Sequence, residues 1–126
     1  FDEATIELEN NSTVSDMYIV GSPIGNRSIA VYNYQKNNTA RLERVKLLAT
    51  GGTLENRGLH SELSSPTLQN IHVTATGNAI NYAIRNYRSS PTMAHITAIA
   101  EAGSSKNYAF YNSGSESTSE IFDLVA

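Results

Sequence analysis

The sequence contains no cysteine, which excludes disulfides and any metal site built on thiolates. It has no apolar run of about 18 residues, so it encodes no membrane-spanning helix. No segment of about 11 residues repeats its apolar positions with the period of an amphipathic helix. Glycine-rich phosphate loops are missing as well. What remains, for a chain of 126 residues, is one domain rich in β-strands that buries roughly two thirds of its unfolded surface.

Charge is segregated along the chain, although the formal net charge is only −3. Eight of the nine basic residues lie between Arg27 and Arg88, while acidic residues gather near both ends. A basic middle section attracts anionic glycans or nucleic acid, but a charge count concerns association and not fold. Because the chain is acidic overall and carries no nucleic-acid motif, we expect no nucleic-acid partner.

One stretch of the sequence occurs twice. Residues 64–84 read SSPTLQNIHVTATGNAINYAI, and the pattern returns in residues 89–110 as SSPTMAHITA followed by NYAF. The offset is 25 residues from Pro66 to Pro91 and 26 from Asn81 to Asn107. Self-similarity at a fixed period of this size is typical of folds in which each repeat stacks on the next.

Three columns of apolar residues extend this repeat over most of the chain. Within each repeat the strand residues alternate between apolar and mixed positions, as in a half-buried strand. The spacing of the first column falls from 28 to 26 and then to 25 residues. Stacked repeats bury such columns together. The columns are Val14, Leu42, Leu68 and Met93; Met17, Val45, Ile71 and Ile96; and Ile19, Leu47, Val73 and Ala98.

Turn signals separate the strands of each repeat. A glycine follows each strand, and the two Ser-Ser-Pro segments mark a corner, because proline suits a corner or the first residue of a strand. One further position precedes the middle apolar column, and its Asp, Asn and His residues tolerate a positive φ. We therefore expect a bend at this position, which is held by Asp16, Arg44, Asn70 and His95.

A second strand in each repeat begins with asparagine. Two and three residues after Asn56, Asn81 and Asn107 come a small residue and an apolar one. Side chains alternate between the faces of a regular strand, so either the chain bends there or one of the two lies on a packed outer face. The first copy aligns either as residues 26–29 or as residues 28–31. Asparagines in register predict a ladder of hydrogen bonds along the stack.

This order of strand, glycine turn, second strand and Ser-Ser-Pro corner resembles one coil of the right-handed parallel β-helix proteins of the pectate-lyase-like superfamily. That superfamily includes secreted polysaccharide enzymes, phage tailspikes and adhesins. The resemblance implies an all-β, right-handed parallel β-helix (β-solenoid) of about 4–5 coils, with 25–28 residues per coil. Residues 1–126 then form a single domain, with an entry segment at 1–12 and coils at 13–124. The final coil places Phe122 on Ile96 and Leu124 on Ala98.

An antiparallel β-sandwich is the rival fold, since regular turns every 8 to 12 residues or so would suit it too. A sandwich does not require whole-coil self-similarity, so the repeat favours the solenoid.

Two groups of outward positions are candidates for function. Tyrosine and arginine suit stacking on sugars and hydrogen bonding to them, and they also suit protein interfaces. An outward column of apolar residues predicts a lateral patch, formed by Val20, Leu48 and Ile99. The tyrosine and arginine stripe consists of Arg57, Tyr82 and Tyr108, with His60, Arg85 and Tyr111 three positions further on.

Residues for catalysis or metal binding do not gather in the aligned coils. Glycoside hydrolases use paired carboxylates, but Glu55 and Glu62 flank the second strand and are expected to lie too far apart. Lyases of the superfamily bind calcium through clustered Asp residues, which the alignment does not provide. A zinc site needs three or four converging ligands, so we expect the histidines to be solvated or hydrogen-bonded. We therefore expect no metal, no cofactor and no catalytic residue.

The sequence thus predicts a non-enzymatic extracellular structural or adhesive module, which self-associates as part of a fibre, filament or surface protein of a cell or virion. The alternative is a carbohydrate-binding or polysaccharide-degrading domain, with glycans as partners. No signal peptide is visible and the chain begins at Phe1, so we expect a processed or truncated chain. Asn-x-Ser/Thr triplets predict glycosylation at Asn11, Asn26 and Asn37.

Overall fold

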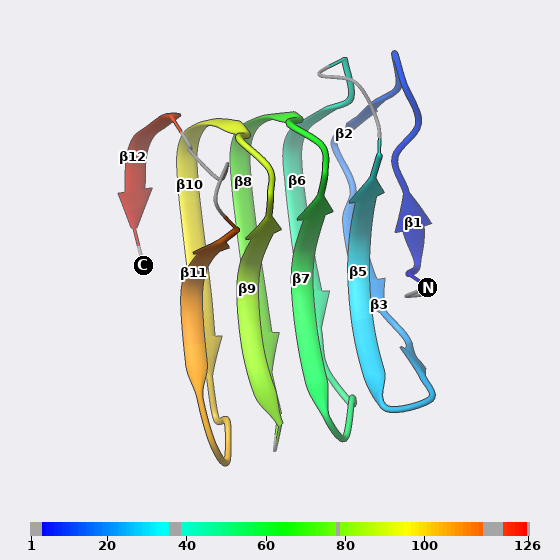
Figure 1. Ribbon diagram of the computed structural model, residues 1–126, viewed down its shortest axis with the longest axis vertical. Coiled ribbons are helices and arrows are strands. Elements are labelled where there is room, and N and C mark those ends of the chain that lie inside the picture. The colour runs from blue at the N-terminus through cyan, green and yellow to red at the C-terminus, as the bar shows by residue number, and fades with distance from the viewer. Residues whose placement is uncertain (1–3, 36–38, 78, 115–119, 126) are drawn as a thin grey trace.

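The structure, a computed structural model, describes residues 4–35, 39–77, 79–114 and 120–125, with the side chains of 120–124 excepted. All regular elements in these ranges are strands (Figure 1). The described residues form no helix that is long and apolar enough to cross a membrane. The strands are β1 (Ile6–Glu7), β2 (Thr13–Ser15), β3 (Tyr18–Gly21), β4 (Pro23–Ile24), β5 (Arg27–Tyr34), β6 (Arg41–Ala49), β7 (Glu55–Glu62), β8 (Thr67–Thr76), β9 (Ile80–Tyr87), β10 (Thr92–Glu101), β11 (Asn107–Ser113) and β12 (Glu120–Val125).

The strands form two sheets that face each other. Sheet A has the order β1-β5-β7-β9-β11, with β4 also paired to β5, and sheet B has the order β12-β10-β8-β6-β2, with β3 also paired to β6. All pairs are parallel except β4 with β5. From β5 onward the chain alternates between the sheets, so that each coil adds one strand to each of two layers (Figure 1). This confirms an all-β parallel β-solenoid, of about four turns, and rules out the antiparallel sandwich.

Strand register confirms most of the predicted alignment. Leu42 pairs with Leu68 and Leu68 with Met93, so these coils are 26 and 25 residues long. In sheet A, Ser28 pairs with Asn56 and Val31 with Leu59, which selects the alignment of residues 28–31 for the first copy.

The predicted alignment of the last coil is wrong by two residues. Phe122 pairs with Ala94 and Leu124 with Ile96. The reason is a longer connection, since residues 114–119 join β11 to β12 whereas residues 88–91 join β9 to β10.

The core lies between the two sheets and contains the predicted apolar columns. Leu42, Leu68 and Met93 are at most 1% exposed, as are Leu47 and Val73. Burying each such side chain contributes roughly 1.5–3 kcal/mol.

One member of the middle column departs from this pattern. Met17 was expected in the core beside Val45, but it is 49% exposed. It lies between the end of β2 and the start of β3 at Tyr18, so the pleat of neither strand directs it inward.

A residue with positive φ sets the spacing of the columns in sheet B. Asp16, Arg44, Asn70 and His95 have φ of 55°, 51°, 53° and 55°, which confirms the predicted bend. The last three lie inside β6, β8 and β10 and not before them. The left-handed residue interrupts the two-residue alternation, which is why Leu42 and Val45, three positions apart, are both buried.

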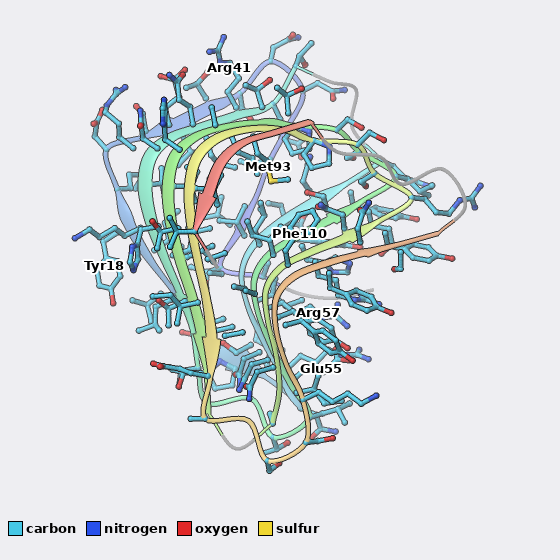
Figure 2. The ribbon with its side chains drawn as sticks, turned by 90° about the vertical axis from the view of Figure 1, so that its left-hand side faces the viewer. Tyr18, Arg41, Glu55, Arg57, Met93 and Phe110 are labelled. Carbon is cyan, nitrogen blue, oxygen red and sulfur yellow. The ribbon has the colours of Figure 1, made fainter. Side chains whose placement is uncertain are left out.

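The strands of sheet A bend at the small residue that directly follows Arg57, Tyr82 and Tyr108. Tyr82 pairs with Tyr108 and Ile84 with Phe110, but Ala83 is not paired with a residue of β11, and Ala83 and Ile84 are both fully buried. The sequence left a bend and a packed outer face as alternatives, and the bend is correct (Figure 2). At Gly58 even the side chain of alanine does not fit, because a Cβ there would overlap the Cγ2 of Val73 on the facing sheet.

An asparagine ladder closes the turn that leads into sheet A. The Nδ2 of Asn56 donates to the Oδ1 of Asn81 at 2.9 Å, and the Nδ2 of Asn81 donates to the Oδ1 of Asn107 at 2.9 Å. The same Nδ2 also lies 3.0 Å from the carbonyl oxygen of Gly77 and 2.7 Å from that of Glu101. This confirms the predicted ladder and ties each turn to the coil above it.

Candidate functional site

The bend in sheet A brings the two predicted rows of the tyrosine and arginine stripe together. In a regular strand, positions three apart point to opposite faces. Across the bend they share the outer side, where Arg57 and Glu55 lie, away from Met93 in the core (Figure 2). Strand pairing sets the first row as Arg57, Tyr82 and Tyr108 and the second as His60, Arg85 and Tyr111. We call these six residues the aromatic face.

Three tyrosines form the centre of the aromatic face. The rings of Tyr82 and Tyr108 are stacked, with centroids 5.2 Å apart and an interplanar angle of 9°. Tyr111 meets both rings at an angle, at 5.4 Å from Tyr82 and 5.0 Å from Tyr108. All three side chains are half-buried. Each such ring pair stabilises by roughly 0.5–1.5 kcal/mol beyond its buried area, so the tyrosines hold one another in fixed positions.

His60 links the two arginines of the face. Its Nδ1 lies 2.9 Å from the Nη1 of Arg57, and its Nε2 lies 3.0 Å from the Nη1 of Arg85. A neutral imidazole accepts at one nitrogen only and arginine only donates, so in either tautomer one of the two contacts is a conventional hydrogen bond.

Two members of the aromatic face, His60 and Arg57, are too deeply buried to contact a ligand. His60 is 1% exposed and Arg57 is 3% exposed. The sequence predicted both as outward ligand contacts; they do lie on the outer side of the sheet, but neighbouring side chains cover them. Their role in the face is to position Arg85, which His60 contacts directly and Arg57 contacts through His60.

The two glutamates of β7 complete the ionic network. The Oε2 of Glu55 is bound by Arg57 and lies 3.2 Å from the Nε of Arg27. The Oε2 of Glu62 accepts a hydrogen bond of 3.1 Å from the hydroxyl of Tyr32. It also lies 3.9 Å from the Nε2 of His60. Both carboxylates therefore serve to hold neighbouring side chains.

Sequence reasoning missed Tyr32, which continues the row of His60. Its ring centroid lies 5.0 Å from that of His60 and 5.8 Å from that of Tyr34. Tyr32 pairs in register with His60. The signal was present in the sequence, but it depends on the alignment of residues 28–31, which the sequence left open.

Arg85 is an arginine of the aromatic face that forms no ion pair with a described carboxylate. Its guanidinium carbon lies 5.6 Å from the centroid of Tyr82, within the range of cation–π attraction. Its side chain is half-buried and makes no ion pair with the residues that the structure describes. Burial, and then the charge of Glu55, raises the pKa of Tyr82. The phenol beside Arg85 therefore stays a hydrogen-bond donor at neutral pH.

The outer face of sheet B is organised differently. Arg44 binds the carboxylate of Asp16 with two hydrogen bonds, of 2.6 and 2.8 Å, and this contact lowers the pKa of Asp16. The predicted apolar column is interrupted, because Thr74 lies between Leu48 and Ile99 in the pairing of β6, β8 and β10. Val20, at the end of that row, is 43% exposed. The apolar patch predicted from sequence is therefore not continuous.

Two further kinds of site concern metal binding and glycosylation. In residues 4–35, 39–77 and 79–114, no three His, Asp or Glu side chains come together in a way that would hold a metal ion. Asn11 and Asn26 are exposed and lie in turns, so both are accessible to a glycosylating enzyme. Asn37 lies outside the described residues.

Comparison with known proteins adds little to this description. No protein-family model and no curated protein matches the chain. One solved structure, a protein of Parabacteroides merdae provisionally named a glycosyl hydrolase, is similar over 95% of this chain and 76% of its own, with 12% identity and a TM-score of 0.42. A likeness this distant carries no statement about residues or activity.

Proposed function

We propose that this chain is a non-enzymatic adhesive module that binds glycans through the aromatic face, outside a cell or on the surface of a cell or virion. The observation that carries the proposal is the packing of Tyr82, Tyr108 and Tyr111 beside Arg85, a half-buried guanidinium with no ion pair among the described residues. Tyrosine rings stack on the apolar faces of sugars while their hydroxyls hydrogen-bond, and arginine donates to sugar hydroxyls.

Preorganisation supports the same proposal. Ring contacts fix the tyrosines, and His60 fixes Arg85, so a ligand does not have to order these side chains. Groups held in place before binding lose less conformational entropy when the ligand arrives. The rows repeat at each strand, about 4.8 Å apart, which suits an extended polymer that crosses several coils.

The positions of the two carboxylates of β7 favour binding of a glycan over its cleavage. Hydrolysis by paired carboxylates places them roughly 5–9.5 Å apart, across one glycosidic bond. Glu55 and Glu62 are the first and last residues of β7, and each already binds a neighbouring side chain. These positions support a role in holding side chains over a role in catalysis.

A glycan array tests the proposal. We expect the wild-type chain to bind a subset of glycans, and Tyr82→Ala and Tyr108→Ala to weaken this binding about ten-fold or more, because each removes a stacking ring. Tyr18→Ala is the matched control on neutral glycans, since Tyr18 is 63% exposed and lies on sheet B. Far-UV circular dichroism checks that each variant is folded. Equal binding by Tyr82→Ala and the wild type, or no glycan bound at all, would contradict the proposal.

Self-association is a second candidate function, favoured by the edge of sheet A. Among the described strands, β11 pairs only with β9, and Ala109 and Phe110 of β11 are only partly buried against the core. An unpaired strand edge is a template for a strand of another chain. We expect the sedimentation coefficient to rise with protein concentration. It should rise further with salt, which screens the acidic residues near the chain ends. A monomer at all concentrations and ionic strengths would exclude this function.

A further inference from the structure

A pocket of about 440 Å³ opens on the outer face of sheet B, and Leu48 of the predicted apolar column is one of its lining residues. Three adjacent strands build it: Tyr18 of β3 pairs with Lys46 of β6, and Lys46 pairs with His72 of β8. Two residues further along, Leu48 and Thr74 form a second row. Tyr18 projects from this face, on the side of the solenoid opposite Arg57 and Glu55 (Figure 2). The pocket is therefore separate from the aromatic face.

The charge of this pocket is not compensated. Neither Lys46 nor His72 makes an ion pair or a hydrogen bond with a side chain in the described part of the protein. Two acidic residues close to Lys46 in the sequence are already paired with arginines. Asp16 is bound by Arg44, and Glu43 lies 2.9 Å from Arg41 and 3.4 Å from Arg44. The ammonium group of Lys46 therefore lies in the wall of the pocket without an ion pair among the described residues.

The other walls are suited to the body of a ligand. The ring of Tyr18 is 63% exposed and Leu48 is half-buried, so both offer apolar surface. Thr74 offers a hydroxyl. The volume falls within the range of small-molecule sites, roughly 300–1,000 Å³.

We infer that this pocket binds a ring-sized organic anion, whose carboxylate or sulfate group meets Lys46 and His72 while its ring packs against Tyr18 and Leu48. The negative group supplies the missing counter-charge, and the ring covers the exposed tyrosine. Such a group belongs either to a carboxylated sugar or to a sulfated one, and the two sources share the same recognition chemistry.

An NMR titration of the wild-type chain with four probes tests the inference: glucuronate, glucose 6-sulfate, glucose and inorganic sulfate. We expect glucuronate, glucose 6-sulfate or both to shift the ring signals of Tyr18 and His72 saturably, and the tighter of the two identifies the source of the anion. Glucose and inorganic sulfate should each bind at least about five-fold more weakly, because one lacks the charge and the other lacks the ring.

The matched variants are Lys46→Gln and Lys106→Gln, both at exposed positions. Lys46→Gln should weaken binding of the charged sugar roughly five-fold, and Lys106→Gln, which lies in the turn before β11, should leave it unchanged. The inference is overturned if no probe shifts Tyr18 and His72, if glucose or inorganic sulfate binds as tightly as the charged sugars, or if the two lysine variants behave alike. Signals of Tyr82 in the same spectra report the aromatic face separately, so failure there does not affect this result.

Discussion

Replacing Asn81 with alanine is expected to lower the free energy of unfolding by about 3–4 kcal/mol. Asn81 is fully buried in the middle of the asparagine ladder. Alanine removes its contacts with Asn56, Asn107 and the carbonyl oxygens of Gly77 and Glu101. Asn56 is itself fully buried and then has no acceptor for its Nδ2, and buried polar groups without partners are destabilising. Urea denaturation measures the effect.

Asn107→Ala is the internal control for this prediction. Asn107 stands at the end of the ladder and is exposed, so water replaces the lost partner. We expect its cost to be about 1 kcal/mol. Equal costs at Asn81 and Asn107 would show that position in the ladder does not matter, and would contradict the role of the ladder in joining the coils.

Replacing Arg57 with alanine is expected to destabilise the chain by about 3 kcal/mol, since it breaks a buried ionic network from one side. The side chain of Arg57 is 4% exposed and binds Glu55 and His60. Loss of the Arg57 side chain leaves an empty space within the aromatic face. It also removes a partner from Glu55 and from His60. Glu55 keeps its contact with Arg27 at 3.2 Å and is 14% exposed, which holds the cost below that of a fully buried pair.

Arg57→Met separates packing from charge. Methionine refills most of the volume, and the added Glu55→Gln change removes the carboxylate that has lost Arg57 as a partner. We expect the double variant to recover at least half of the stability lost in Arg57→Ala, because buried ion pairs are often replaced by apolar residues at little cost. If the double variant is no more stable than Arg57→Ala, the contribution of Arg57 is not that of a buried ion pair.

The sequence was sufficient to predict the coil because its apolar, asparagine and turn residues recur periodically. The columns of Leu68 and Met93 recur at the coil length, and stacking is the arrangement that buries them all. Asp16 and Asn70 marked the positive-φ position by residue type alone. The ladder followed from asparagines in register.

What the sequence did not reveal depends on side-chain packing between coils. The bend after Tyr82 brings Tyr111 onto it, but alternation along a regular strand argues against this contact. Burial of His60 follows from the neighbours that cover it, which no single strand specifies. The pocket beside Tyr18 arises because side chains of three strands leave space between them. Such features depend on three-dimensional packing and produce no periodic pattern in the sequence.

The most direct test of the account is whether a glycan contacts the aromatic face. We would titrate the wild-type chain with the best-bound neutral glycan of the array and follow the tyrosine ring signals by NMR. The account predicts saturable shifts at Tyr82, Tyr108 and Tyr111, with Tyr18 unchanged and with binding about ten-fold weaker or more in Tyr82→Ala. Shifts at Tyr18 alone, or saturable glycan binding that leaves the rings of Tyr82, Tyr108 and Tyr111 unmoved, would contradict it.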